Sequence, residues 1–174
     1  MTNGGIFGPK LSGKTTLGIA LSRQFWQKEQ RRTLVLDPHL EEWGEHAKSY
    51  EDEAEFWKAV WSVQNCLIIV EEAAATIRRE RSLVPVFTRL RHNHHKLLVI
   101  GHSGMDLLPV MRQQLDLIFL FRQPKSAATV WAETFTEDRL LQSMKLKQFQ
   151  FIRCELYQKP QTMILGKGKT DSPT

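Results

Sequence analysis

Short apolar runs alternate along the chain with stretches in which apolar residues recur every three or four positions. A short apolar run bounded by polar residues predicts a buried strand, and the longer spacing predicts a helix with one apolar face. Strands that alternate with helices are typical of a mostly parallel sheet covered on both faces. The first strand is expected to be short, because Gly4 and Gly5 are poor strand formers. Strands are predicted near residues 6–7, 33–37, 66–71, 97–102 and 117–121.

Helices are predicted between these strands and beyond them. Helices are expected from about residue 14, near 53–63 and 85–91, after Met105, and near 126–134 and 137–144. Residues 149–157 and 162–165 then predict a hairpin that turns at Lys159 and Pro160. A length of 174 residues with 41% hydrophobic content suits one globular domain. We therefore expect a single domain over residues 1–165 and a flexible tail over 166–174.

The sequence contains no candidate membrane span. The longer apolar runs, such as residues 115–121, are far shorter than the ~20 residues that cross a bilayer, and this run contains Asp116. No charged and apolar leader precedes Gly8. We therefore expect a soluble, intracellular protein.

Cysteines and histidines do not indicate a disulfide framework or a zinc site. Cys66 and Cys154 are the two cysteines, too few for a four-thiolate zinc site, so we expect two buried or reduced thiols. His92, His94 and His95 have no cysteines at ligand spacing. This favours solvated or interface histidines over zinc ligands.

A glycine-rich loop provides the first chemical signal. Residues 8–15, Gly-Pro-Lys-Leu-Ser-Gly-Lys-Thr, match the pattern GxxxxGK[ST] between an apolar run and an amphipathic helix. The glycines would let the backbone wrap a phosphate chain, Lys14 would neutralise the outer phosphates, and the hydroxyl of Thr15 would bind Mg²⁺. The alternative is an ordinary turn between a strand and a helix. The residues predicted to bind ATP are Gly8, Pro9, Lys10, Leu11, Ser12, Gly13, Lys14, Thr15 and Thr16.

Two consecutive carboxylates end the apolar run of residues 67–70. A buried strand has no structural use for paired acids at its end unless a cation or a reacting water uses them. In phosphate-loop hydrolases the first acid holds Mg²⁺ and the second activates the attacking water. Glu71 is therefore a predicted magnesium ligand with Thr15, directly or through water, and Glu72 is the predicted catalytic base. The alternative is a helix N-terminus that is simply rich in acids.

His102 follows a further apolar run, residues 97–100, and would lie beside the phosphate site. Its imidazole could hydrogen-bond the outer phosphate or the attacking water, or could merely cap the strand. We include it among the predicted catalytic residues.

The formal net charge of +5 is unevenly distributed. Residues 41–55 contain seven acids and one lysine, whereas residues 78–96 contain six lysines and arginines and one glutamate. A second basic stretch covers residues 145–169. Such separation suits a ring with opposed faces or a basic channel, although solvated charged faces give the same pattern. Basic segments of this kind predict salt-sensitive contacts with DNA phosphates that do not read sequence.

Several segments together resemble a known superfamily. They are the loop at Gly8, the segment Leu-Val-Leu-Asp-Pro-His-Leu-Glu-Glu-Trp at 34–43, the acids in Ile-Val-Glu-Glu-Ala at 69–73, Arg91 with Lys96, and Leu-Val-Ile-Gly-His at 98–102. These segments resemble the FtsK-HerA superfamily of P-loop motor ATPases. The small single-domain form is most similar to the genome-packaging ATPases of membrane-containing icosahedral viruses such as tectiviruses. The resemblance covers residues 6 to about 122 and excludes the C-terminal third.

The resemblance implies an α/β P-loop NTPase fold, a three-layer sandwich with a sheet of order 5-1-4-3-2. It implies a homo-oligomeric ring of about six subunits, a hexamer, which hydrolyses ATP at subunit boundaries and drives double-stranded DNA through its centre. Its setting would be the host cytoplasm or the packaging vertex of the virion, with procapsid vertex proteins as further partners. Arg91, or next Arg89, would act as an arginine finger on a neighbouring subunit. The predicted DNA contacts are Arg78, Arg79 and Arg81.

Three alternative functions fit parts of the same pattern. A phage assembly ATPase of the zonula occludens toxin kind has the same loop, but such proteins normally carry a membrane-spanning segment. A nucleoside kinase similar to thymidine kinase also has a similar loop, but the zinc-binding cysteines of that family are absent here. The third is a nucleotide-dependent switch or interaction module. Glu72 argues against it because it supplies a base.

Overall fold

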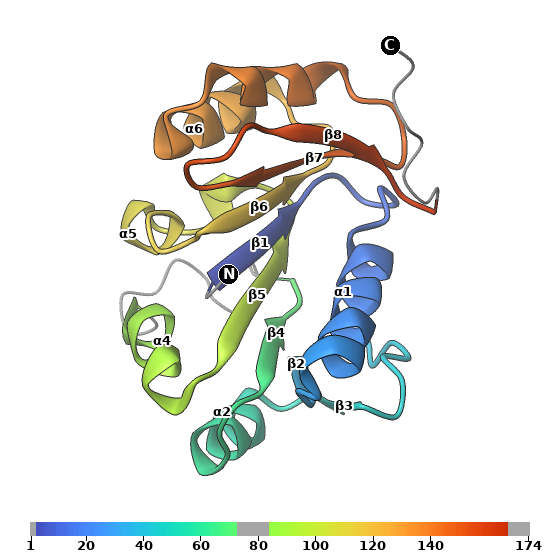
Figure 1. The fold of residues 1–174 in the computed structure, drawn as a ribbon, viewed down its shortest axis with the longest axis vertical. Helices are drawn as coiled ribbons and strands as arrows, with labels where there is room; N and C mark the ends of the chain where they lie inside the picture. Colours follow the sequence, from blue (N-terminus) through green and yellow to red (C-terminus); the bar gives the residue numbers. More distant parts are fainter. Residues whose placement is uncertain (1–2, 73–83, 167–174) are drawn as a thin grey trace.

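An eight-stranded sheet runs through the centre of the protein (Figure 1). The computed structural model describes residues 3–72 and 84–166. The strand order is β3-β2-β4-β5-β1-β6-β7-β8; pairing is parallel from β3 to β6 and antiparallel from β6 to β8. The strands are β1 (Asn3–Phe7), β2 (Thr33–Leu36), β3 (Ala47–Tyr50), β4 (Leu67–Val70), β5 (Lys96–Gly101), β6 (Leu117–Leu120), β7 (Gln150–Glu155) and β8 (Gln161–Ile164).

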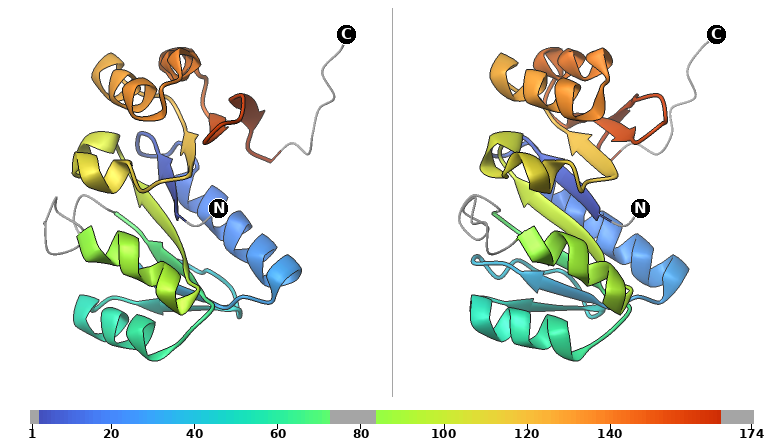
Figure 2. Two further views of the ribbon diagram at one scale, coloured as in Figure 1. Left: turned by 60° about the vertical axis from the view of Figure 1, so that its left-hand side comes forward. Right: turned by 90° about the vertical axis from the view of Figure 1, so that its left-hand side faces the viewer.

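Helices cover both faces of the sheet, which gives the predicted three-layer sandwich. In the part of the chain that the structure describes, α1 lies on one face, and α2, α4, α5 and α6 lie on the other (Figure 2). The α-helices are α1 (Lys14–Glu29), α2 (Glu53–Ser62), α4 (Val84–Arg89), α5 (Pro109–Arg112) and α6 (Lys125–Phe135). The 3₁₀ helices are η2 (Leu90–Asn93), η3 (Gly104–Asp106) and η4 (Asp138–Lys145).

Alternation along the strands divides the apolar side chains between two cores. Neighbouring residues of a strand point to opposite faces, so Ile6 packs in the core that contains Leu17 of α1, and Phe7 packs in the other core. Phe7 contacts Trp131 of α6, with ring centroids 4.6 Å apart. The buried strands therefore fix the two helical layers relative to one another.

The first strand is longer than the sequence predicted. β1 includes both glycines, and the ring of Phe7 lies over Gly5. A Cβ atom at Gly5 would be 2.3 Å from Cε2 of Phe7, so a larger residue would displace the ring. Gly5 made the strand harder to predict from the sequence, but its lack of a side chain gives the ring of Phe7 room to pack there.

The five predicted strands are all present, and their relative order is the predicted one, β6-β1-β5-β4-β2. The complete sheet differs because β3 extends it beyond β2 and the hairpin β7–β8 extends it beyond β6. The sequence analysis missed β3, because residues 47–50 contain no apolar run and are partly or fully exposed. The predicted helix over 137–144 is η4, a 3₁₀ helix.

The C-terminal hairpin was expected and joins the sheet edge. Apart from Gly166, the predicted tail over 166–174 lies outside the described residues, so the proposed domain bounds remain a prediction. None of the described helices combines the length and apolar character needed to cross a membrane.

His95 is a structural residue and not the solvated or interface histidine that the sequence favoured. Its side chain is 1% exposed. Nδ1 accepts a hydrogen bond from the Cys66 N–H (3.1 Å), and Nε2 donates to the Val60 carbonyl (3.1 Å). Burial lowers the pKa of His95, although these backbone contacts oppose the shift. The neutral ring thus ties the end of α2 to the start of β4.

This geometry predicts a loss of stability in mild acid. The unfolded chain binds more protons at His95 than the folded chain, so the free energy of unfolding should decrease as the pH falls below 6.5. One histidine can contribute at most about 1.4 kcal/mol per pH unit. His46, whose pKa burial also lowers, adds to the effect. Urea unfolding at about pH 7.5 and 5.5 should show a smaller loss in His95→Gln than in the wild type.

The exposed His92 provides the control. His92→Gln should keep the wild-type pH dependence. An unchanged pH dependence in His95→Gln would contradict the assignment.

Candidate functional site

Residues 8–13 form a tight loop between the carboxyl end of β1 and the first turn of α1. A Cβ atom at Gly8 would be 2.5 Å from Cβ of Phe121, so the loop can approach the end of β6 only with glycine there. Gly13 has φ +101°, and a Cβ atom on it would be 2.5 Å from Cδ2 of Leu165. The first turn of α1 contains no acid and has no side-chain cap, so its backbone amides can bind an anion.

Lys14 directs its charge into the same loop. Its side chain is largely buried, and Nζ donates to the Pro9 carbonyl at 2.9 Å. Burial lowers the pKa of Lys14, while Glu71 and Glu72 oppose the shift. A bound phosphate would add negative charge beside the ammonium group and stabilise its charged form.

Thr15 and Glu71 bring α1 and β4 together. The Thr15 hydroxyl donates to Oε1 of Glu71 at 2.5 Å, and the Glu72 N–H donates to Oε2 at 2.9 Å. Glu71 is 6% exposed, so its carboxylate is fixed at both oxygens in a largely dry position. A hydroxyl and a carboxylate are the hard oxygen donors that suit Mg²⁺. No group of three or more His, Cys, Asp or Glu side chains in the described chain could hold a metal, so Mg²⁺ here would also need phosphate oxygens and water.

Glu72 follows directly and adopts a positive φ of 48°. Its Oε1 atom is 3.4 Å from Nε2 of His39, and both side chains are partly exposed. A non-glycine residue in this conformation is uncommon and marks a position that its surroundings determine. The carboxylate therefore lies at the open side of the site, where a water molecule can reach it.

The sequence analysis missed the side chains that follow β2. Asp37 is fully buried and accepts from the backbone N–H groups of His39 (2.9 Å) and Glu41 (2.8 Å) and from Nε1 of Trp43 (2.9 Å). These bonds fold the loop so that His39 contacts Glu72. An aspartate before proline is a turn signal. It was available in the sequence but gave no indication of a contact with Glu72.

These elements enclose a hollow of about 270 Å³, which we call the acid-side hollow. It brings together the predicted Lys14, Thr15, Glu71, Glu72 and His102. Nδ1 of His102 is 3.4 Å from the Gly8 carbonyl oxygen, and its backbone N–H donates to Oδ2 of Asp106 at 3.1 Å. The residues that line this hollow are Lys10, Leu11, Lys14, Thr15, Asp37, His39, Glu41, Glu71, Glu72, Gly101 and His102.

The predicted arginines do not join this hollow. Arg89 ends α4 and Arg91 lies in η2, both exposed and both before β5. The phosphate loop follows the carboxyl end of β1, and β5 runs parallel to β1. The two arginines precede β5, so they lie toward the amino ends of the strands, away from the loop (Figure 1). Residues 78, 79 and 81, the predicted DNA contacts, lie outside the described residues.

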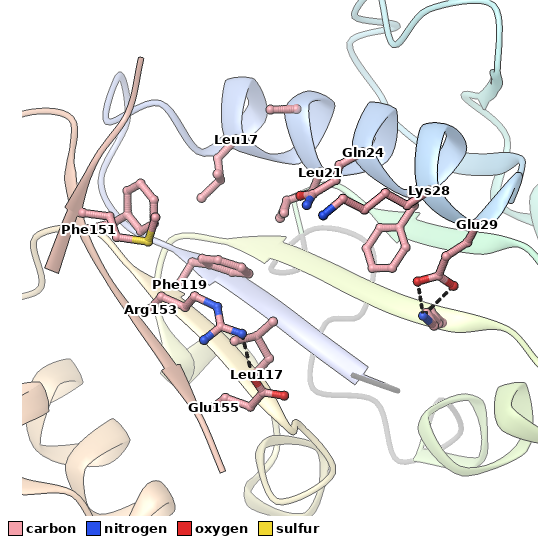
Figure 3. Close-up of a pocket in the computed structure, with 14 residues that line it drawn as sticks. Leu17, Leu21, Gln24, Lys28, Glu29, Leu117, Phe119, Phe151, Arg153 and Glu155 are labelled. Carbon is pink, nitrogen blue, oxygen red and sulfur yellow. Dashed lines mark hydrogen bonds and ion pairs between the residues drawn. The ribbon is translucent and has the colours of Figure 1, made fainter. Parts of the chain in front are cut away.

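A larger hollow lies elsewhere, between α1 and strands β6 to β8. It measures about 580 Å³, and Leu117, Phe119 and Phe151 form much of its wall (Figure 3). Ion pairs of Lys96 with Glu29 and of Arg153 with Glu155 neutralise charges around it. Four of its charged side chains are thus paired with one another.

Comparisons with known proteins agree with this geometry. The genome-packaging NTPase B204 of Sulfolobus turreted icosahedral virus 2, in complex with sulfate, matches with a TM-score of 0.77 and 17% identity over 92% of this chain and 94% of that chain. This chain therefore has the fold of the P-loop NTPases. The predicted fold class and the predicted resemblance to packaging ATPases are confirmed at the level of the fold.

Two further solved structures share the fold. The N-terminal domain of zonular occludens toxin from Neisseria meningitidis matches with a TM-score of 0.62 and 13% identity, over 96% of this chain and 94% of that chain. The cytoplasmic domain of the Type VII secretion ATPase EccC from Thermomonospora curvata has a TM-score of 0.65 at 12% identity, over 98% of this chain and 26% of that chain. No family model and no curated protein matches this chain by sequence.

The buried lysine of the loop predicts a strong effect on nucleotide binding. Lys14→Ala should weaken ATP binding on the order of 100-fold, because a charged hydrogen bond to phosphate is lost in a buried position. Titration calorimetry would measure the change. Lys28→Ala, at an exposed lysine near the other end of α1, should bind ATP as the wild type does. Equal ATP affinities of the Lys14 and Lys28 variants would contradict the assignment of the loop to the nucleotide site.

Proposed function

We propose that this protein hydrolyses ATP with Mg²⁺ and uses the energy to translocate double-stranded DNA, as a motor that packages a viral genome. The observation that carries the proposal is the placement of Glu71 against Thr15, with Glu72 beside it, at the phosphate loop. A phosphate-binding loop alone would serve a kinase or a switch. A second carboxylate next to the proposed metal position supplies the base that hydrolysis requires.

Five residues of the acid-side hollow have a role in this proposal. Lys14 and the loop amides hold the phosphates, and Thr15 with Glu71 holds Mg²⁺, directly or through water. Glu72 orients the attacking water and accepts its proton. His102 contacts the outer phosphate or that water. Magnesium, when bound, neutralises charge on the transferring phosphoryl group.

The charges of the acid-side hollow support a need for additional cations. Two lysines, Lys10 and Lys14, line it together with four carboxylates. A triphosphate adds several more negative charges, so stabilising the transition state needs Mg²⁺ and a further cation from outside the hollow. Arg91 lies at the amino ends of the strands and the phosphate loop at their carboxyl ends, so Arg91 does not contact the phosphates of its own subunit. This supports a role at the phosphates of a neighbouring subunit in a head-to-tail ring.

The proposed partner is duplex DNA, bound without sequence preference. Lys145, Lys147 and Lys159 are among the described residues of the second basic stretch. The packaging proposal also draws on the fold shared with B204, which is the DNA-packaging ATPase of Sulfolobus turreted icosahedral virus. B204 has been determined with AMP, AMPPCP and ATP-gammaS, which supports an adenine nucleotide as the ligand here. The setting would be the host cytoplasm or the packaging vertex, with procapsid vertex proteins as further partners.

A phage assembly ATPase of the zonula occludens toxin type is the second candidate. The fold shared with the zonular occludens toxin domain favours it. The two candidates predict the same hydrolysis and differ in whether duplex DNA stimulates it.

Glu72→Gln should separate binding from hydrolysis. The variant should bind ATP within a few-fold of the wild type, but its turnover should fall about 10²- to 10⁴-fold because the amide cannot accept the proton. Wild-type turnover should rise with added duplex DNA and not with nucleosides. A phosphate-release assay with and without DNA measures both effects, with Glu55→Gln, an exposed glutamate of α2, as the control. Phosphorylated nucleosides as products would contradict the motor.

Mixed rings test whether the arginine acts between subunits. Lys14→Ala and Arg91→Ala should each be inactive alone, and a 1:1 mixture should regain activity at about a quarter of the boundaries, where an intact loop meets an intact arginine. The same experiment with Arg89→Ala decides between the two arginines. Mixtures that form rings but regain no ATPase activity would exclude Arg91 as the finger.

A further inference from the structure

A second hollow borders the phosphate loop on the side away from the acids. It measures about 380 Å³, and we call it the hairpin-side hollow. β1 lies between β5 and β6, so β5 and the acid-side hollow flank one side of the loop, and the residues that follow β6 flank the other. Lys10 and Leu11 line both hollows, which therefore meet at the tip of the loop. Its lining includes Ser12 of the loop, Phe121 and Arg122 after β6, and Lys147, Gln148 and Phe149.

The wall opposite the loop is a tight turn at residues 147–150. The Lys147 N–H donates to Oε1 of Gln150 (2.9 Å), and the Gln150 N–H donates to the Lys147 carbonyl (3.1 Å). The Leu165 N–H donates to the Phe149 carbonyl (2.9 Å), which ties the turn to the end of the hairpin. Gln148 Nε2 is 3.5 Å from the Leu11 carbonyl oxygen. The turn is thus positioned by the hairpin and lies directly against the phosphate loop.

Phe149 is the unusual residue of this turn. It is an aromatic residue with φ +64°, a conformation that costs free energy and persists where the surroundings determine it. Its side chain is 45% exposed. A Cβ atom on Gly13 would be 3.4 Å from its Cδ1 atom, so the ring edge reaches the loop. The structure therefore holds a half-exposed aromatic ring next to the phosphate-binding backbone.

A nucleoside triphosphate at this loop has two ends with different chemical needs. The outer phosphate must face Glu71 and Glu72, where a cation and a reacting water can be held. The nucleoside end then leaves on the other side of the loop, where an apolar face is available. Phe149 offers that face, and the Gln148 amide can both donate to and accept from a base edge.

A buried hydroxyl strengthens the argument. Ser12 is 6% exposed and lines the hairpin-side hollow, and its Oγ atom has no hydrogen-bond partner among the described residues. A buried polar group without a partner is costly, and a ligand that supplies the partner removes the cost.

We propose that the turn at residues 147–150 is the nucleobase site of this protein, with Phe149 as the surface on which the base stacks. The proposal rests on the proposed binding of ATP at the phosphate loop. It gives the C-terminal hairpin a function, because the hairpin positions the ring against the loop.

The test compares ATP with inorganic tripolyphosphate, which has the phosphates but no base. In titration calorimetry, Phe149→Ala should weaken ATP binding about 10-fold through the loss of one stacking contact, and should leave tripolyphosphate binding unchanged. Phe149→Trp should restore ATP binding. Tyr157→Ala is the matched control, because Tyr157 is also an exposed aromatic residue with positive φ (65°) in the turn between β7 and β8. It should bind both ligands as the wild type does.

The possible outcomes separate this proposal from the one on which it rests. If the wild type binds both ligands and Phe149→Ala changes neither affinity, the base site is wrong and the ATPase proposal stands. If Phe149→Ala weakens both ligands equally, the ring supports the loop through Gly13 and does not bind the base. If the wild type binds neither ligand, the proposed function fails and the base site fails with it.

Discussion

The hydrogen bond between Thr15 and Glu71 is the contact on which the site depends. β4 and β1 are not neighbours, because β5 lies between them, and two strand spacings amount to about 10 Å. The Glu71 side chain carries its carboxylate to the first turn of α1, across the end of β5. The length of the Glu71 side chain is thus compatible with a close approach to Thr15. The acid-side hollow lies in the region that this contact spans.

Patterns that depend on neighbouring residues in the chain were readable from the sequence. Five strands and the loop with its lysine were predicted, because an apolar run or a contiguous motif marks each of them. The order of these strands came from the resemblance to the FtsK-HerA superfamily. β3 was missed because backbone hydrogen bonds to β2, and not apolar side chains, hold it in the sheet. The Thr33 N–H donates to the His46 carbonyl and the Asp37 N–H to the Tyr50 carbonyl, and neither bond requires an apolar side chain. His95 was misjudged for a related reason, since its partners come from α2 and β4.

The parts of the site that were missed come from distant segments. The contact of His39 with Glu72 follows from the fold of the loop around Asp37, and the contact of Gln148 with Leu11 joins residues 137 positions apart. No local periodicity contains that information, because it arises only when the hairpin pairs with β6. Residues predicted from the motif therefore form the phosphate side of the site. Residues that could be identified only from the folded structure form the opposite wall of the site.

The glycines of the loop show why both halves of the chain must be in place at once. Gly8 packs against Phe121 at the end of β6, and Gly13 against Leu165 at the end of the hairpin, each so closely that a methyl group would clash. The loop is therefore shaped by β5 and β4 on one side and by the C-terminal strands on the other. Leu165 also holds the carbonyl of Phe149, so a displacement of the loop at Gly13 must be accommodated by the same turn that faces the hairpin-side hollow. The close packing at Gly8 and Gly13 therefore couples these two ends of the loop to the C-terminal strands. A change in the backbone at Gly13 on binding phosphate would be shared with the hairpin.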